Sequence, residues 1–344
     1  MKPFYLLSLG VLIMAGFANT AFTSDALQWS LSTPAPEPRS DYAAAVLNGR
    51  LILAGGTFWT GSKGHWIQKQ FSRSTHAYDP VSKTWEKLPD LPIPLGLAGG
   101  AVIGDKLFIL GGFTGTKVNR QIFVLEKQQG RYVWKIFGEL PFDRVYPRAV
   151  AVGSSLYLVG GTTKFEPRDP TGTCCTCKNA TRTLLVLNTE RPGSGWSELA
   201  PFPGPDRFHF NAEADGHAVW MFGGIYQADP KDPIVALKNV CKYNVKQRKW
   251  EQMSDLPRVS KEGNSPSPVF VDDGFVIMND FQTVWKLDRS GQNYRELTSL
   301  PQAAQVDRYV WVHRTIVGAS GENFIEGPRR RSDWVFVGQL HPDK

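Results

Sequence analysis

A pair of glycines closes an apolar run four times along the chain, and this internal repeat limits the possible folds more than any other feature. The four segments are residues 51–56, 107–112, 156–161 and 219–224. A second apolar run precedes each segment, separated from it by a short turn such as Asn48-Gly49, which is typical of β-hairpins. A third run follows each Gly pair. Each repeat therefore predicts several short antiparallel strands.

A series of aromatic residues marks the end of each repeat, at spacings of 44 to 62 residues: Trp29, Trp85, Trp134, Trp196, Trp250 and Tyr294. Each precedes a turn that contains Pro, as in Leu88-Pro89. A Gly pair followed by a Trp, with four strands in each unit, resembles the kelch repeat of β-propellers. We expect each Trp to pack against the neighbouring blade, because an indole buries a large apolar area.

Two further units are degenerate. In the fifth, Asn279-Asp280 stands in place of the Gly pair, and the sixth stops at the run 333–337, one strand short of a blade. The run 27–31 can supply the missing strand and leave no unpaired edge between blades. The sequence therefore predicts an all-β fold over residues 25–344, a six-bladed kelch-type β-propeller whose last blade is closed by the N-terminal strand.

The N-terminus is typical of an exported protein. Lys2 is followed by an apolar stretch over residues 4–17 and then by small residues, which predicts a cleaved signal peptide over residues 1–24. The stretch is shorter than the roughly 20 residues that span a bilayer, so we expect no membrane span. The predicted location is periplasmic or secreted.

Four cysteines would then meet an oxidising compartment. They are Cys174, Cys175, Cys177 and Cys241. A disulfide that holds a long loop is one interpretation, and its pairing stays open. A zinc site on Cys174 and Cys177 is the other, although a single pair at this spacing is weak support for a metal.

The net charge of +7 is spread along the chain, and the longest basic run is Arg329-Arg330-Arg331. This distribution predicts no nucleic-acid partner, because such partners select a concentrated basic surface. The sequence indicates no particular oligomeric state.

In a propeller, the loops between second and third strands open on the same face as the start of each first strand, and a ligand site is expected there. Four residues are predicted at this mouth: Arg39, Arg148, Arg207 and His209. Guanidinium groups bind carboxylates through two parallel hydrogen bonds, so these residues favour an acidic small molecule. The alternative is that each Arg pairs with an acidic neighbour such as Asp41.

One loop of the sixth unit carries a more specific pattern. Gly321-Glu322 is followed by Arg331-Ser332-Asp333 and then by Trp334-Val335-Phe336. This pattern resembles the N-acetylneuraminate epimerase (sialic acid mutarotase) family of exported kelch propellers. The resemblance implies that Glu322 transfers protons and that Arg331 is a catalytic or substrate-binding partner. In that family the motif lies earlier in the chain, so the resemblance implies a circularly permuted relative.

The chemistry of such an enzyme needs few groups. Interconverting the α and β anomers of a sialic acid means opening the ring at the hemiketal and closing it on the other face. A single carboxylate that acts as base and then as acid can do this without a cofactor. Two alternatives remain: a non-catalytic kelch propeller that binds protein or glycan partners, and an enzyme of the same architecture that acts on a different sugar.

Overall fold

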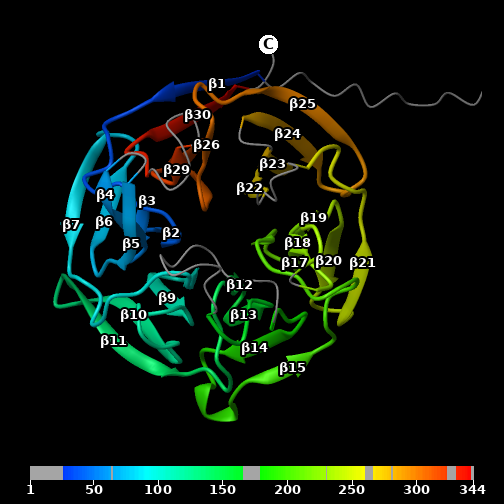
Figure 1. Ribbon diagram of the computed structural model, residues 1–344, viewed down its shortest axis with the longest axis horizontal. Helices are drawn as coiled ribbons and strands as arrows, with labels where there is room; N and C mark the ends of the chain where they lie inside the picture. Colours follow the sequence, from blue (N-terminus) through cyan, green and yellow to red (C-terminus); the bar gives the residue numbers. More distant parts are fainter. Residues whose placement is uncertain are drawn as a thin grey trace, which may run out of the picture.

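The computed structural model describes residues 26–62, 65–165, 179–229, 231–259, 266–279, 282–323 and 331–341. Six four-stranded antiparallel sheets stand around a central axis as the blades of a propeller (Figure 1). The predicted all-β, six-bladed fold is confirmed. The predicted signal peptide, residues 1–24, lies outside the described residues, and in the ranges above no helix is long and apolar enough to cross a membrane.

The first three blades follow one another along the chain, with strands given from the axis outward. Blade 1 contains β2 (Ala43–Leu47), β3 (Arg50–Ala54), β6 (Thr75–Asp79) and β7 (Thr84–Leu88). Blade 2 contains β8 (Gly99–Ile103), β9 (Lys106–Leu110), β10 (Gln121–Gln128) and β11 (Arg131–Glu139). Blade 3 contains β12 (Arg148–Val152), β13 (Ser155–Val159), β14 (Leu184–Asn188) and β15 (Ser197–Leu199), with a 3-10 turn, η1 (Pro192–Ser194), before its last strand.

The other three blades complete the ring. Blade 4 contains β16 (Asn211–Ala214), β17 (Ala218–Phe222), β20 (Val240–Asn244) and β21 (Lys249–Gln252). Blade 5 contains β22 (Ser267–Val271), β23 (Gly274–Asn279), β24 (Thr283–Asp288) and β25 (Tyr294–Ser299). Blade 6 contains β27 (Tyr309–Val312), β28 (Thr315–Ala319), β30 (Val335–His341) and β1 (Ala26–Leu31).

Three small strand pairs lie in the loops beside the blades. They are β4 (Thr57–Ser62) with β5 (His65–Phe71), β18 (Ile225–Tyr226) with β19 (Val235–Ala236), and β26 (Ala304–Gln305) with β29 (Glu322–Asn323). The first two pairs lie between the second and third strands of blades 1 and 4. The third joins the segment before β27 to the segment after β28. They therefore gather on the face where the ligand site was expected.

The ring closes between the two ends of the described chain. Strand β1 pairs antiparallel with β30, from Ala26 opposite His341 to Leu31 opposite Phe336, so the two strands lie together at the rim (Figure 1). Trp29 stands opposite Gly338, and a Cβ on that glycine would come within 2.7 Å of the indole. The predicted closure by the N-terminal strand is confirmed, and a glycine makes room for it.

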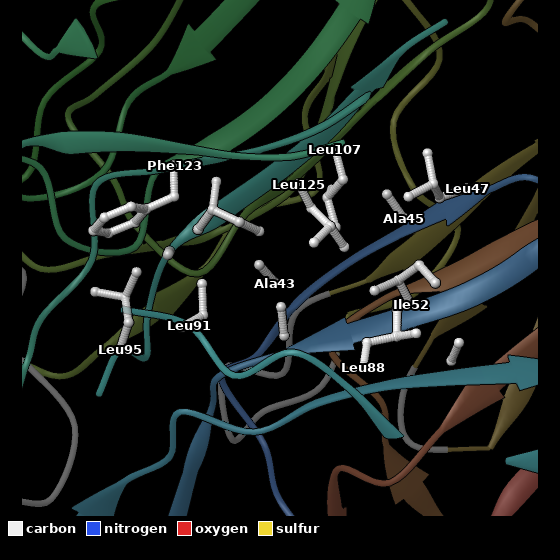
Figure 2. Close-up of a cluster of buried hydrophobic side chains, with 14 residues drawn as sticks. Ala43, Ala45, Leu47, Ile52, Leu88, Leu91, Leu95, Leu107, Phe123 and Leu125 are labelled. Atoms are coloured by element: carbon white, nitrogen blue, oxygen red, sulfur yellow. The ribbon is translucent and has the colours of Figure 1, made fainter. Parts of the chain in front are cut away.

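The hydrophobic core is divided into clusters that lie between neighbouring blades. Figure 2 shows the cluster between blades 1 and 2, where Ala45 and Ile52 pack near Leu107 and Leu125. Five other clusters occupy the remaining five junctions in the same way. Each blade therefore buries both of its faces only when both neighbours are present.

The outer-strand tryptophans tie these junctions together. Four of them donate an indole N–H to a backbone carbonyl at the outer edge of the preceding blade: Trp85 to Thr33 (3.1 Å), Trp134 to Pro89 (2.9 Å), Trp196 to Glu139 (3.1 Å) and Trp250 to Ala200 (2.7 Å). The repeated Trp thus packs against the neighbouring blade as the sequence predicts.

An ion pair crosses the central channel. Arg308, just before β27, donates to both carboxylate oxygens of Glu213 on β16, at 3.0 and 3.3 Å, and to the carbonyl of Gly100 on β8, at 2.8 Å. A cavity of about 290 Å³, lined by first strands from all six blades, lies beside this pair and extends to Gly216 in the turn after β16. The ion pair therefore links three blades across the axis.

Candidate functional site

The loops of blades 6 and 1 bring an acid–base pair together at the mouth of the channel. Glu322 lies on β29, and Arg331 forms an isolated backbone bridge with it. The guanidinium group of Arg331 donates to Glu322 Oε1 and, at 3.3 Å, to Thr57 Oγ1 of blade 1. Arg331 is 4% exposed and Glu322 30% exposed. The structure thus places the two residues singled out by the sequence in direct contact.

A buried carboxylate that the sequence did not single out as a site residue completes this cluster. Asp41 accepts hydrogen bonds from Thr57 Oγ1 at 2.6 Å and from Lys69 Nζ at 3.0 Å, and Arg331 Nη2 lies 3.8 Å away. Burial alone would raise the pKa of Asp41, but the charges of Lys69 and Arg331 and these hydrogen bonds hold it well below its usual range. Asp41 is therefore ionised at neutral pH.

The backbone around this cluster adopts an uncommon conformation. Asp41, Tyr146 and His209 have positive φ angles of 57°, 54° and 54°, which few residues other than glycine adopt. Tyr146 donates its hydroxyl to Asp41 Oδ1 at 3.3 Å, and the His209 ring lies 4.9 Å from the Tyr146 ring. His209 therefore lies at the same mouth as Asp41. Strained backbone of this kind tends to gather at functional sites.

Arg148 opens β12 and faces the channel. Its Nε donates to the carbonyl of Phe210 at 2.9 Å. Its other two nitrogens make no hydrogen bond with the residues that the structure describes. Burial lowers the pKa of Arg148, and nearby Asp307 opposes that shift, but an arginine keeps its charge at neutral pH. Arg148 therefore offers a paired set of N–H donors to an anionic ligand.

Arg39 and Arg207 lie at the predicted mouth, but their side chains turn into the blades. Arg39 is 2% exposed and donates to the carbonyls of Gly55 (2.9 Å) and Ser74 (2.7 Å). Arg207 is fully buried and donates to the carbonyl of Gly223 at 3.3 Å. Buried carbonyls at the Gly pairs need donors, and these guanidinium groups supply them. We therefore assign both residues to the blades rather than to the site.

This assignment predicts opposite effects of two similar substitutions. Arg39→Met is expected to lower the free energy of unfolding by about 2 kcal/mol, because buried carbonyls lose their donors. Its affinity for an acidic ligand should be unchanged. Arg148→Met should keep the stability within about 1 kcal/mol, since it loses one backbone hydrogen bond, and should weaken ligand affinity at least about tenfold. Urea unfolding and ligand titration measure the two effects, and a loss of affinity in Arg39→Met at full folding would overturn the assignment.

An apolar wall lies on the same face. Phe71, Phe113 and Phe165 come from the loops after the second strands of blades 1, 2 and 3. The first two rings meet edge to face with centroids 5.5 Å apart, and the second and third stack at 4.3 Å. Together with the charged cluster, this wall gives the mixture of apolar surface and few placed polar groups that is typical of small-molecule sites.

Several residues named from the sequence lie outside the described residues: Cys174, Cys175, Cys177, Arg329 and Arg330. Cys241 is a free thiol in the core of blade 4, where burial raises its pKa to about 11. Within the ranges that the structure describes, no three His, Cys, Asp or Glu side chains come together as a metal site.

Comparison with known sequences identifies the repeat. A profile of the Kelch motif matches residues 38–92, which include all of blade 1 together with Asp41, Thr57 and Lys69. The chain carries a Kelch motif. The six-bladed architecture is consistent with a propeller that contains this motif.

Several known proteins share parts of the sequence. Alpha-scruin of Limulus polyphemus is 22% identical over 233 residues, which are 67% of this chain and 24% of scruin. The N-(sulfonatooxy)prop-2-enimidothioate sulfolyase of Thlaspi arvense is 28% identical over 179 residues, 50% of this chain and 48% of that protein. The N-acetylneuraminate epimerase of Vibrio cholerae is 31% identical over 85 residues, 24% of this chain and 22% of the epimerase. The matched part of this chain thus spans about a quarter to a half of each relative.

Proposed function

We propose that this kelch propeller is a mutarotase that interconverts the α and β anomers of N-acetylneuraminate or a related sialic acid. The contact between Glu322 and Arg331 at the channel mouth carries the proposal. It unites a carboxylate that is partly exposed, and so accessible to substrate, with a buried cation. The partial similarity to an N-acetylneuraminate epimerase supports the same substrate class. The predicted export of the protein stays part of the proposal.

Proton transfer at the anomeric centre is the task of Glu322. One oxygen of its carboxylate accepts from Arg331, and the other makes no hydrogen bond with the residues described in the structure. The unengaged oxygen can take the proton of the anomeric hydroxyl while the bond from the anomeric carbon to the ring oxygen breaks. Arg331 fixes the orientation of the carboxylate through this charge-assisted hydrogen bond.

Substrate binding falls to other groups of the mouth. The charge of Lys69 is matched by Asp41, and that of Arg331 by Glu322 and Asp41. Arg148 keeps N–H donors free of described protein partners, so it is the cation that we assign to the substrate carboxylate. The rings of Phe71, Phe113 and Phe165 offer an apolar surface to the carbon-bound hydrogens of the sugar.

Proton NMR of freshly dissolved α-N-acetylneuraminic acid tests this proposal directly. The purified protein is expected to speed the approach to the anomeric equilibrium over buffer alone, and Glu322→Gln is expected to lose about 100-fold or more of that acceleration. Glu126→Gln is a matched control, because it makes the same chemical change in an ion pair with Lys106 and Lys135 on blade 2. Folded wild-type protein that leaves the rate unchanged for this and other acidic sugars would overturn the proposal.

A non-catalytic binding role is the second candidate. It is favoured by the match to alpha-scruin, which covers 67% of this chain. The name of that protein refers to no enzymatic reaction. In that case ligand or partner binding would persist in Glu322→Gln and no anomer would be interconverted faster. The NMR experiment therefore separates the two candidates.

A further inference from the structure

A chain of backbone hydrogen bonds runs from blade to blade around the channel mouth. The N–H of Leu97 donates to the carbonyl of Asp41, and the N–H of Tyr146 donates to the carbonyl of Leu97, both at 2.8 Å. All three residues have positive φ angles. At the junction of blades 6 and 1, the N–H of Asp41 donates instead to the side-chain Oδ2 of Asp307, at 2.7 Å. A carboxyl group thus takes the place that a backbone carbonyl holds at the next two junctions.

Only one oxygen of Asp307 is engaged in this way. Oδ1 accepts no hydrogen bond from the residues that the structure describes, and the residue as a whole is neither fully buried nor fully exposed. A backbone carbonyl would have sufficed to accept the Asp41 N–H. The second oxygen of Asp307 is therefore available for another partner at the mouth.

Charged and titratable groups face Asp307 from three blades. They are Asp41 and Tyr42 of blade 1, Arg148 of blade 3, and Arg308 and Arg331 of blade 6. Burial and the negative charge of Asp41 raise the pKa of Asp307 to about 7, although Arg148 and Arg331 act in the opposite direction. Asp41 is the member of the pair that stays ionised, because Lys69 and Arg331 contact it directly.

The backbone also brings Asp307 near Glu322. Strand β26 pairs with β29 so that Gln305 stands opposite Glu322, and Asp307 follows two residues later. Arg331 interacts electrostatically with both carboxyl groups. Two carboxyl groups, each with one oxygen that makes no hydrogen bond among the described residues, therefore share one guanidinium neighbour.

We propose that Asp307 is the second proton-transferring group of this site and works with Glu322 as an acid–base pair. The inference rests on the proposed mutarotase function and assigns the step that would otherwise fall to Glu322 alone. A carboxyl group whose environment raises its pKa, as burial does for Asp307, can serve as an acid in an active site.

The proton balance of the reaction closes within this pair. Glu322, as a carboxylate, takes the proton of the anomeric hydroxyl. A C=O bond then forms at the anomeric carbon while the bond between that carbon and the ring oxygen breaks. Protonated Asp307 gives its proton to the released ring oxygen, which becomes a hydroxyl. After rotation about the adjacent C–C bond, that hydroxyl attacks the other face of the carbonyl and returns its proton to Asp307. Glu322 then protonates the new anomeric oxygen, and both groups regain their starting states.

Three variants and a control test the pair by the same NMR assay. Asp307→Asn keeps an oxygen that can accept the Asp41 N–H, so the fold should persist. It is expected to lose about 100-fold of the acceleration, as is Glu322→Gln. The double variant should be little slower than the slower single variant, because members of one catalytic unit are not additive. Asp206→Asn, in an exposed ion pair with Arg182, should match the wild type.

The pH profile distinguishes proton transfer from a structural role. Because Asp307 must carry a proton at the start, the wild-type acceleration should fall as pH rises through about 7, and the residual activity of Asp307→Asn should lack this fall. Selective carbon-13 labelling of Asp carboxyls should show one resonance that titrates near pH 7 and is absent from Asp307→Asn.

The outcomes are separable. A wild type that is active while Asp307→Asn keeps both its rate and the fall near neutral pH would overturn the pair and leave the mutarotase proposal intact. A wild type without activity on any acidic sugar would overturn the proposed function and the pair with it. A resonance of Asp307 that titrates below about pH 5 would also overturn the pair, because the group would then hold no proton at neutral pH.

Discussion

Replacement of Arg331 by Met is expected to lower the free energy of unfolding by about 3 kcal/mol and to abolish the acceleration of mutarotation. The guanidinium group is 4% exposed and lies beside the carboxylates of Glu322 and Asp41 and the hydroxyl of Thr57. Its removal takes away the cation that these three groups share. Met retains much of the packing of the arginine stem, so the loss reports chiefly on the charge and its hydrogen bonds. Urea unfolding at neutral pH measures the first effect, and proton NMR of the anomers measures the second.

The control for this prediction is Arg50→Met. Arg50 also pairs with a glutamate, Glu86, but the exposed fractions of the two side chains are 20% and 59%, against 4% and 30% for Arg331 and Glu322. Exposed ion pairs contribute at most about 1 kcal/mol, so this variant should be nearly as stable as the wild type. If Arg331→Met loses no more stability than Arg50→Met, the buried network at the mouth is weaker than we infer.

Asp307→Asn is expected to stabilise the protein above neutral pH while it removes activity. Folding raises the pKa of the Asp307 carboxyl from 3.8 to about 7, chiefly through burial. Between these two pH values the folded state holds a proton that the unfolded state has released. The stability contributed by this group is therefore present below about pH 4, falls as pH rises through the window, and is lost above about pH 7. Asn does not titrate, so the variant escapes this loss.

At pH 8 the variant should be more stable than the wild type by about 2 to 4 kcal/mol, and the difference should close toward pH 4. Thermal or urea unfolding of both proteins at several pH values gives the two curves. Asp206→Asn should run parallel to the wild type, because its carboxylate is 59% exposed. Parallel curves for Asp307→Asn and the wild type would show that Asp307 is ionised in the folded protein at ordinary pH. A residue that lowers stability and raises activity is typical of functional sites.

The blades could be predicted from the sequence because each repeat encodes its own sheet. The Gly pairs and the outer-strand Trp recur at regular spacing, and in blades 1 to 5 all four strands of a sheet come from one continuous stretch of the chain. The pairing of β1 with β30 joins strands far apart in the sequence, and it could be predicted because the sixth unit lacks a strand that the N-terminal run supplies.

The contacts of the candidate site could be predicted from the sequence only where the residues lie close together in the chain. Glu322 and Arg331 lie nine residues apart in a single loop motif, so their contact has a local signature. Asp41 and Asp307 are 266 positions apart and meet only because the ring closes. No local sequence pattern around Asp41 or Asp307 predicts the hydrogen bond between them. A positive φ at Asp41 is likewise a property of the folded turn.

Arg39 and Arg207 show the opposite limit. Both residues lie just before the first strand of a blade, as the sequence predicts. The direction in which each side chain points, however, decides whether it contacts a ligand or the blade. The carbonyls of Gly55 and Gly223 lie within reach inside the blade and draw both guanidinium groups inward. Arg148 lies on the first strand of its blade and donates its Nε to the carbonyl of Phe210 in the next blade.

The pairing of β1 with β30, which closes the ring, also governs how the molecule responds to mechanical force. Ala26 and His341 are paired at one end of the β1–β30 ladder, so a pull on these two positions loads one rung at a time, as a zipper opens, rather than shearing all rungs together. Strand β30 begins four residues after Arg331. Peeling β1 away would leave β30, the strand that follows Arg331, held only by its pairing with β28, while blades 2 to 5 keep their own sheets. In a stretched or end-tethered molecule, loss of function should precede loss of the propeller.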